Sequence, residues 1–236
     1  MIASCGVHRD APPNSIAAFE AAIGDGCDMT ETDFRRSADG IIVFHDKEID
    51  GRPVLGMTRQ EIGVATGFLP PTLMDFVECC RGRIAVDCEL KEDGLEEEMV
   101  EAVCAHFSPE QFLFTSFLPS VLERIRQLRR HVPTGLLSMR GLTEHFELHP
   151  EWEDRRSAAE ILDTAREVGA DYVLPDFRDT ELLEAGASGG IDIIAWAART
   201  EPEMRGLLGC STLRGIITDR PDLLMQILRP DGPERR

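Results

Sequence analysis

Residues 83–91 read RIAVDCELK, a short segment in which charged and apolar side chains alternate. Successive side chains of a β-strand point to opposite faces, so this pattern places Asp87, Glu89 and Lys91 on one face and the apolar residues between them on the other. The apolar face can pack against helices, whereas the charged face needs polar surroundings. The segment therefore predicts a strand whose charged face enters the interior of a barrel.

Similar short apolar runs alternate with amphipathic segments along the rest of the chain. The predicted strands are 2–7, 28–34, 41–45, 83–90, 111–116, 133–138, 171–174, 191–196 and 213–218. The predicted helices are 15–24, 72–81, 94–106, 119–130, 157–168, 179–187, 201–208 and 220–228. Parallel strands joined by helices give this alternation, which predicts an α/β protein with a (β/α)8 TIM barrel, provided that 41–45 extends a strand rather than adding one.

The length of 236 residues suits a single barrel domain, which we expect over residues 1–228, with a frayed tail over 229–236. Segment 139–156 fits either a long loop or an irregular helix. Residues suited to helix boundaries are Asn14 and Pro119 at starts, and Gly24 and Gly169 at ends.

The composition limits the class of partner. With 43 acidic and 25 basic residues, a net charge of -18 and no run of Lys and Arg, we expect no nucleic-acid partner and no stable membrane association. The first residues lack the features of a signal peptide, and no run reaches ~18 apolar residues, which predicts a soluble, cytoplasmic protein. The seven cysteines lack CxxC spacing and are expected to be reduced thiols. Whether the chain forms a homo-oligomer stays open.

A second carboxylate pair lies in TETDF, residues 30–34, where Glu31 and Asp33 share one face of a strand. The C-terminal ends of barrel strands meet at one mouth, and there these two side chains and Glu89 would repel one another unless a cation neutralised them. Oxygen ligands select hard ions, so the three residues predict a site for one divalent cation, Mg²⁺ or Ca²⁺. Taken alone, an ExD pair on a strand is more often a solvated or salt-bridged edge.

Other polar residues fall near the same strand ends. Histidine titrates near neutral pH, so His8 and His45 suit an acid and a base, while Arg9 and Lys91 suit the oxygens of an anionic phosphodiester. Each has a structural alternative, since a histidine can pack and a lysine can pair with a neighbouring acid. Two further candidates for substrate binding, each as consistent with packing, are Ser116 and Trp196. The histidines expected to be structural are His106, His131, His145 and His149.

Residues 6–46, GVHRDAPPNSIAAFEAAIGDGCDMTETDFRRSADGIIVFHD, resemble the N-terminal signature of the glycerophosphodiester phosphodiesterase family. That family has an HRG motif, a PENT-like helix start, an ExD strand and a DG turn before a VxHD strand. Later matches are CELK at 88–91, TSF at 115–117, AW at 195–196 and GIITDRPD at 215–222. The resemblance covers nearly the whole chain.

The resemblance implies a phosphoric diester hydrolase of the bacterial cytoplasmic type, active in lipid and glycerol metabolism, which releases sn-glycerol 3-phosphate and an alcohol from a small-molecule phosphodiester. It also implies that the glycerol 2-hydroxyl attacks phosphorus and gives a cyclic phosphate, which water then opens. The implied roles are Glu31, Asp33 and Glu89 as metal ligands, His8 and His45 as acid and base, and Arg9 and Lys91 as phosphate ligands. Alternatives are a lysophospholipase D-like or other alkyl phosphodiesterase using the same site, and a noncatalytic descendant that binds a phosphate ligand.

Three features depart from the family pattern. Asp10 stands in place of the glycine of HRG, which would add a negative charge beside an anionic substrate. Pro13 replaces the glutamate of PENT, and the loop from residue 8 to residue 14 is short. Segment 46–72, an insertion that partly covers the substrate entrance in the family, is abbreviated. These departures leave the predicted metal ligands in place and bear on the identity of the substrate.

Overall fold

The structure, a computed structural model, describes residues 1–140 and 155–229. The predictions that lie outside the described residues are most of segment 139–156, the tail beyond 229, His145 and His149. Of the helices within the described ranges, none is long and apolar enough to cross a membrane.

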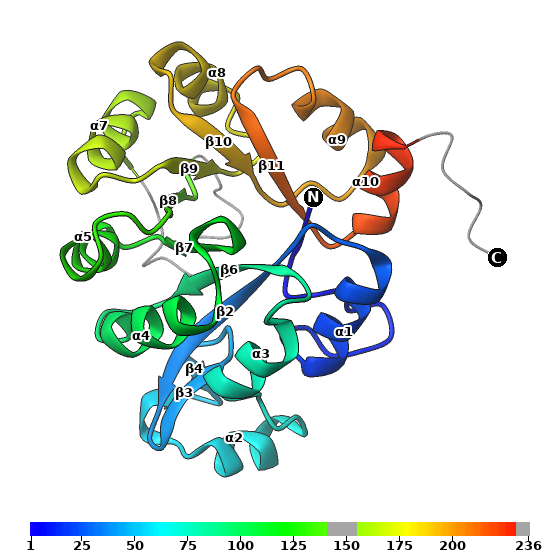
Figure 1. Ribbon diagram of the computed structural model, residues 1–236, viewed down its shortest axis with the longest axis vertical. Helices are drawn as coiled ribbons and strands as arrows, with labels where there is room; N and C mark the ends of the chain where they lie inside the picture. The colour runs from blue at the N-terminus through cyan, green and yellow to red at the C-terminus, as the bar shows by residue number, and fades with distance from the viewer. Residues whose placement is uncertain (141–154, 230–236) are drawn as a thin grey trace.

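Eight parallel strands form the centre of the fold and close into a barrel (Figure 1). These strands are β1 (Ile2–Ala3), β2 (Met29–Ser37), β6 (Ala85–Leu90), β7 (Phe112–Ser116), β8 (Thr134–Ser138), β9 (Tyr172–Pro175), β10 (Asp192–Ala195) and β11 (Leu213–Thr218). The ring closes because β1 pairs with β11 on one side and with β2 on the other. The predicted (β/α)8 barrel is therefore confirmed.

The strand predicted at 41–45 is an extension of the sheet and adds nothing to the barrel itself. It forms β3 (Gly40–Val43), which runs antiparallel to the end of β2. The segment after it contains a helix that the sequence analysis missed, although Thr58 and Glu61 form a capping box at its start. The elements of this segment are β4 (Glu48–Ile49), β5 (Arg52–Pro53), the 3-10 turn η1 (Val54–Gly56) and α2 (Arg59–Thr66).

Helices surround the barrel and connect successive strands (Figure 1). They are α1 (Ile16–Asp25), α3 (Leu73–Cys80), α4 (Glu96–His106), α5 (Pro119–Leu128), α7 (Ala158–Val168), α8 (Thr180–Gly189), α9 (Glu201–Leu207) and α10 (Pro221–Leu228), and a 3-10 turn η2 (Pro109–Gln111) precedes β7. Each predicted helix is present, with its ends shifted by a few residues at most.

Two boundaries of α1 differ from the prediction. The helix is capped by Ser15, whose Oγ accepts a hydrogen bond from a backbone N–H of the first turn at 3.1 Å, and not by Asn14. Asn14 is buried and has a φ of 59°. The helix ends at Gly26 in the left-handed region rather than at Gly24. The predicted boundary residues found in place are Pro119 at the start of α5 and Gly169 at the end of α7.

The first strand is shorter than predicted because the chain turns sharply after Ala3. Cys5 and Gly6 both have positive φ, 51° and 79°. A Cβ on Gly6 would lie 2.7 Å from the carbonyl carbon of Ala18, so the turn can approach α1 this closely only with glycine. A backbone hydrogen bond of 2.9 Å from Asn14 N to Cys5 O closes the loop that follows.

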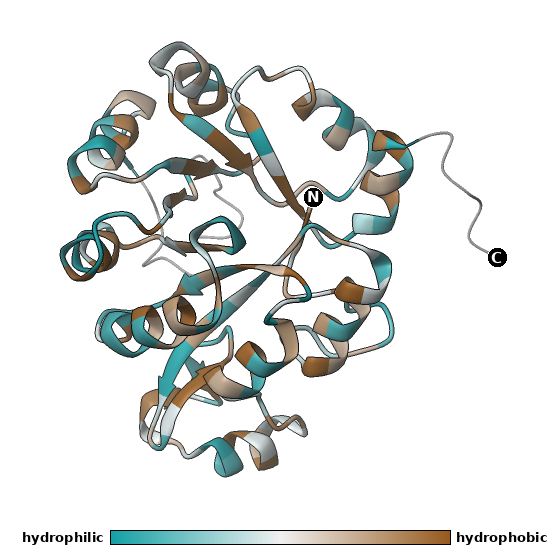
Figure 2. Ribbon diagram, in the orientation of Figure 1, coloured by the Kyte–Doolittle hydropathy of each residue, from teal (hydrophilic) through white to brown (hydrophobic). Residues whose placement is uncertain are grey.

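Apolar packing stabilises the barrel on both sides of its wall. Outside it, the buried rings of Phe19 and Phe34 each pack edge to face on Phe76, with centroids 5.0 and 5.4 Å apart. Burial of one such side chain stabilises the fold by roughly 1.5–3 kcal/mol. Inside the barrel, a separate apolar cluster contains Ile2, Leu113, Leu137, Leu174, Ile194 and Ile217. In Figure 2, β10 is largely hydrophobic, whereas the end of β2 is hydrophilic.

Candidate active site

Carboxylates gather inside the barrel where β2 and β6 lie side by side. The strand register places Glu31 beside Asp87 and Asp33 beside Glu89, and the second pair lies nearer the C-terminal ends of the strands. All four side chains are buried. They occupy the face that the alternation in TETDF and RIAVDCELK predicted.

A cavity of about 300 Å³ opens over these carboxylates. This volume is at the lower end of the range for small-molecule sites, roughly 300–1,000 Å³. The wall formed by β2 and β6 is charged, whereas the wall formed by β8 to β11 is mainly apolar. Other residues that line the cavity include Ser4, Cys5, His45, Lys91, Thr115, Phe117, Trp196 and Arg199. The cavity therefore suits a ligand that has both an anionic group and a carbon skeleton.

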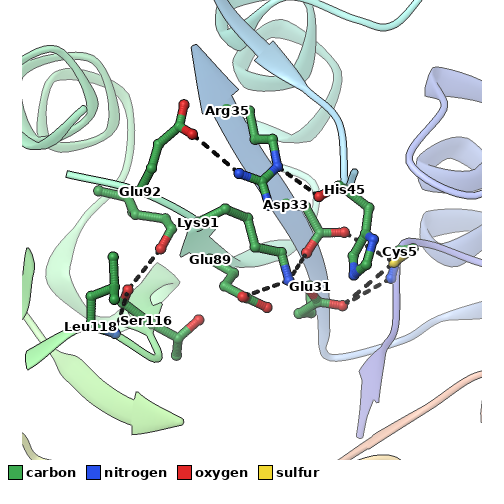
Figure 3. Close-up of polar contacts among 12 residues, drawn as sticks. Cys5, Glu31, Asp33, Arg35, His45, Glu89, Lys91, Glu92, Ser116 and Leu118 are labelled. Atoms are coloured by element: carbon green, nitrogen blue, oxygen red, sulfur yellow. Dashed lines mark hydrogen bonds and ion pairs between the residues drawn. The ribbon is translucent and has the colours of Figure 1, made fainter. Parts of the chain in front are cut away.

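The ammonium of Lys91 lies between two carboxylates, as Figure 3 shows. Its Nζ is 2.9 Å from Asp33 Oδ1 and 2.6 Å from Glu89 Oε1. Burial disfavours the charged forms of Lys91 and Asp33, but the attraction between their opposite charges outweighs this effect. The pKa of Lys91 is therefore raised and that of Asp33 is lowered. For Glu89, burial prevails over the attraction of Lys91 and the pKa is raised. Lys91 and Asp33 therefore form a buried ion pair.

Glu31 is held by the turn that follows β1 (Figure 3). Its Oε2 accepts hydrogen bonds from Cys5 N at 3.0 Å and from Ser4 Oγ at 3.2 Å. The Cys5 thiol lies 3.9 Å from the same oxygen and 3.5 Å from Asp33 Oδ2. Burial, followed by repulsion from Asp33 and Glu89, raises the pKa of Glu31 well above its usual range. Burial also raises the pKa of the Cys5 thiol, and the adjacent carboxylates add to the effect.

Asn14 fixes the orientation of Asp33. Its Nδ2 donates a hydrogen bond of 2.7 Å to Asp33 Oδ2, and its Oδ1 accepts one of 2.6 Å from Thr32 Oγ1. The two oxygens of Asp33 therefore face Asn14 and Lys91 respectively. The sequence analysis missed this role because an asparagine before a helix reads as a cap, and its positive φ could not be foreseen.

Asp87 lies deeper in the barrel than Lys91, and within the described residues no cationic side chain forms an ion pair with it. Thr115 Oγ1 donates a hydrogen bond of 2.7 Å to Asp87 Oδ1, while Oδ2 is buried without a hydrogen-bond partner in the described structure. Burial raises the pKa of Asp87 to about 8. Together with Glu31, it shows that the interior holds more carboxylates than Lys91 can neutralise.

His45 lines the cavity, and no other histidine in the described ranges does. Arg35 Nε donates a hydrogen bond of 2.7 Å to the backbone oxygen of His45, and the same guanidinium lies 3.1 Å from Glu92. On the ring itself, Nδ1 is 2.8 Å from Asp46 Oδ1. A carboxylate at this position favours the tautomer with its proton on Nδ1. The ring is therefore positioned through both its backbone and its side chain.

His8 and Arg9 do not line the cavity. His8 Nε2 lies 3.7 Å from Asp219 Oδ1. The guanidinium of Arg9 lies 2.6 Å from Asp25 and 3.5 Å from Asp222. The structure thus separates both residues from the carboxylates that they were expected to assist.

The end of β1 is occupied instead by the segment Ser4–Cys5–Gly6. Gly6 is the position at which the fold requires glycine, whereas Asp10 is exposed. Residues 4–6 therefore occupy the end of β1 beside the cavity, where residues 8–10 were expected. Asp10 consequently places no charge in the cavity.

Ser116 and Trp196 have different positions. Ser116 Oγ donates a hydrogen bond of 2.7 Å to Leu90 O and does not line the cavity, whereas its neighbour Thr115 does. Trp196 lines the cavity and packs edge to face on Phe117, with centroids 5.8 Å apart. The structure therefore brings Trp196 into the site and leaves Ser116 between two strands.

The residues present fit a divalent cation. Ligand atoms of Cys5, Glu31 and Asp33 all lie within 4.8 Å of one another. Glu89 does not belong to this group, because Lys91 lies between its carboxylate and that of Asp33. A cation nearby would compensate the burial of these carboxyl groups, among which Asp87 has one oxygen without a hydrogen-bond partner in the described structure. The ligand group that the structure assembles thus contains a thiol that the sequence analysis did not consider.

Comparisons with known proteins show which proteins the chain resembles in sequence and fold. The model of the Glycerophosphoryl diester phosphodiesterase family matches residues 6–66. The chain is 26% identical to a glycerophosphodiester phosphodiesterase of Caldanaerobacter subterraneus over 98% of both chains. The fold resembles a glycerophosphodiester phosphodiesterase of Agrobacterium tumefaciens (TM-score 0.72, 22% identity, 96% and 97% of the chains covered). It also resembles an Oleispira antarctica phosphodiesterase in complex with the product sn-glycerol-3-phosphate (TM-score 0.77, 19% identity, 96% and 95% covered). The predicted family resemblance is confirmed.

Proposed function

We propose that this chain, which resembles the glycerophosphodiester phosphodiesterase family, hydrolyses glycerophosphodiesters to sn-glycerol 3-phosphate and an alcohol with a divalent cation. Its relatives identify it as a phosphoric diester hydrolase. The observation that carries the proposal is the cavity, where buried Glu31 and Asp33 lie beside Lys91 and His45 at the mouth of the barrel. Such products would belong to lipid and glycerol metabolism.

Glu31 and Asp33 would hold the cation, with Asn14 and the Cys5 amide orienting their oxygens. A bound divalent cation supplies neutralisation of the charge that develops on the phosphoryl oxygens. Lys91 provides the buried positive charge next to these carboxylates, and we assign it to a phosphate oxygen of the substrate. This arrangement supports phosphodiester binding at the mouth of the barrel.

Arg199 takes the place expected for Arg9, because it lines the cavity. Its Nε lies 2.5 Å from Asp219 Oδ2, at the rim. We assign proton transfer at the reacting oxygens to His45, which is the histidine that the described part of the chain brings to the cavity. The apolar wall that includes Trp196 would cover the carbon skeleton of the substrate.

The proposal is tested by measuring product release from glycerophosphocholine, glycerophosphoethanolamine, glycerophosphoglycerol and lysophosphatidylcholine, each with Mg²⁺, Ca²⁺ or Zn²⁺. We expect turnover of at least one glycerophosphodiester, loss of turnover after chelation and recovery when the cation returns. Glu31→Gln, which keeps the size of the side chain, should lose turnover, whereas the exposed Glu48→Gln should not.

The assay also separates the alternatives. Turnover of lysophosphatidylcholine alone would indicate a lysophospholipase D-like enzyme that uses the same site. Binding of sn-glycerol 3-phosphate without turnover of any diester would indicate a descendant that only binds a phosphate ligand. Full activity in excess chelator would contradict the role of the cation.

A further inference from the structure

The turn after β1 places a sulfur atom beside the two carboxylates that are best placed to hold a cation. Cys5 Sγ lies 3.5 Å from Asp33 Oδ2 and 3.9 Å from Glu31 Oε2. Two ligands of one tetrahedral zinc ion, with bonds of about 2.3 Å to sulfur and about 2.1 Å to oxygen, lie roughly 3.6 Å apart. The sulfur therefore lies close to this spacing from each of the two carboxylates, and the ligand atoms of all three side chains lie within 4.8 Å of one another.

The backbone holds Cys5 in this position. Its φ of 51° is in the left-handed region that residues with a side chain rarely adopt, and Gly6 continues the turn against α1. Cys5 N donates to Glu31, and Cys5 O accepts from Asn14 N. Asn14 in turn orients Asp33. One network thus fixes the thiol and both carboxylates, as hydrogen-bonded neighbours do around metal ligands.

A second, independent observation indicates that a cation belongs in this cavity. Asp87, fully buried and beside Glu31 in the strand register, lines the same cavity and has an oxygen without a hydrogen-bond partner in the described structure. The buried ammonium of Lys91 is already shared by Asp33 and Glu89. The buried carboxyl groups that line this cavity therefore outnumber the single buried ammonium that the described residues bring to it.

We propose that Cys5 is a metal ligand, and that with Glu31 and Asp33 it forms a mixed sulfur and oxygen site that prefers Zn²⁺ to Mg²⁺ or Ca²⁺. The proposal deepens the proposed function, since it names the cation of the same cavity. Sulfur ligands favour Zn²⁺, whereas Mg²⁺ and Ca²⁺ require oxygen ligands. As the sulfur–metal bond forms, the thiol proton passes to the buffer, so binding should release a proton.

Metal binding by the full chain, measured without substrate, tests the proposal. In calorimetric titrations of the chelator-treated protein, Cys5→Ser should weaken Zn²⁺ binding ~10-fold or more and leave Mg²⁺ binding nearly unchanged. Glu31→Gln should weaken the binding of both ions. Cys210→Ser serves as the matched control, because Cys210 is also only partly buried but does not line the cavity, and it should bind Zn²⁺ like the original chain.

Co²⁺ gives a spectroscopic test of the sulfur–metal bond. The original chain should show a thiolate-to-metal charge-transfer band that Cys5→Ser abolishes. Glu31→Gln should weaken the band although it keeps all seven thiols, so the test survives even if Cys5→Ser folds poorly. No band in the original chain, or equal Zn²⁺ affinity in Cys5→Ser, would overturn the proposal. Turnover with Mg²⁺ but no Co²⁺ band would reject Cys5 as a metal ligand and leave the proposed function standing. A Co²⁺ band without turnover of any diester would support Cys5 as a metal ligand and reject the proposed function.

Discussion

His8 and Asp219 face each other outside the cavity, with Nε2 3.7 Å from Oδ1. The contact shows that a histidine next to the end of a barrel strand need not enter the barrel. Both side chains are partly exposed, at 30% and 25%. A contact of this kind between exposed groups contributes little to stability, about 0–1 kcal/mol.

The two histidines should therefore differ in their effect on catalysis. His45→Ala should lower kcat by ~10²-fold or more, the usual scale of general acid–base catalysis, because His45 lines the cavity. His8→Ala should lower it by less than about tenfold, since its ring lies outside. Steady-state kinetics of the two variants measure both losses of kcat. Equal losses would show that His8 reaches the substrate during turnover and would restore the two-histidine scheme.

Removal of Lys91 should destabilise the cation-free protein. Lys91→Met leaves Asp33 and Glu89 as buried carboxylates without their shared ammonium, a change that typically costs about 3–5 kcal/mol. Urea unfolding in the presence of chelator measures the loss. The chain has one other lysine, the exposed Lys47, and Lys47→Met should alter the free energy of unfolding by no more than about 0.5 kcal/mol. A similar effect of both substitutions would mean that the ion pair adds nothing to stability.

Asp87 should make the cation-free protein less stable as the pH rises. Its pKa is about 8 in the folded chain against 3.8 as a free group, so between these values the folded chain binds the extra proton. The corresponding stability is complete below about pH 4 and is lost as the pH rises to about 8, at most roughly 6 kcal/mol. Asp87→Asn keeps an oxygen for the hydrogen bond from Thr115 and should remove this dependence. Unfolding free energies of both proteins in chelator, compared at pH 5, 7 and 9, should diverge with pH; parallel curves would contradict the assignment.

Local sequence patterns predicted the barrel because they depend on periodicity. The alternation in residues 83–91 and the capping signals at Pro119 and Gly169 act within a few residues of one another, so the sequence alone locates most strands and helices. The helix α2 was missed although Thr58 and Glu61 carry its capping signal, because only one of its residues, Ile62, is buried and the apolar pattern is weak.

The N-terminal turn could not be predicted in the same way. Its place in the fold depends on the close approach of Gly6 to Ala18, a tertiary contact that no local pattern reports. Residues 8–10, HRD, resemble the HRG motif of the family. The turn after β1 comes before these residues, however, and it brings Ser4 and Cys5 to the cavity instead. The carboxylates of β2 and β6 were located correctly because strand alternation decides which face they occupy.

The route of the reaction gives the last prediction. The family resemblance implies that the glycerol 2-hydroxyl attacks phosphorus and gives a cyclic phosphate, which water then opens. His45 lies at the cavity and can accept the hydroxyl proton in this step. A substrate without the 2-hydroxyl has no internal nucleophile, so it should bind with nearly unchanged affinity and react at least ~10²-fold more slowly. Direct attack by water would make the hydroxyl dispensable. Comparison of kcat and Kd for deoxy and natural substrates separates the two routes, and similar kcat values would reject the cyclic phosphate even if His45 proved essential.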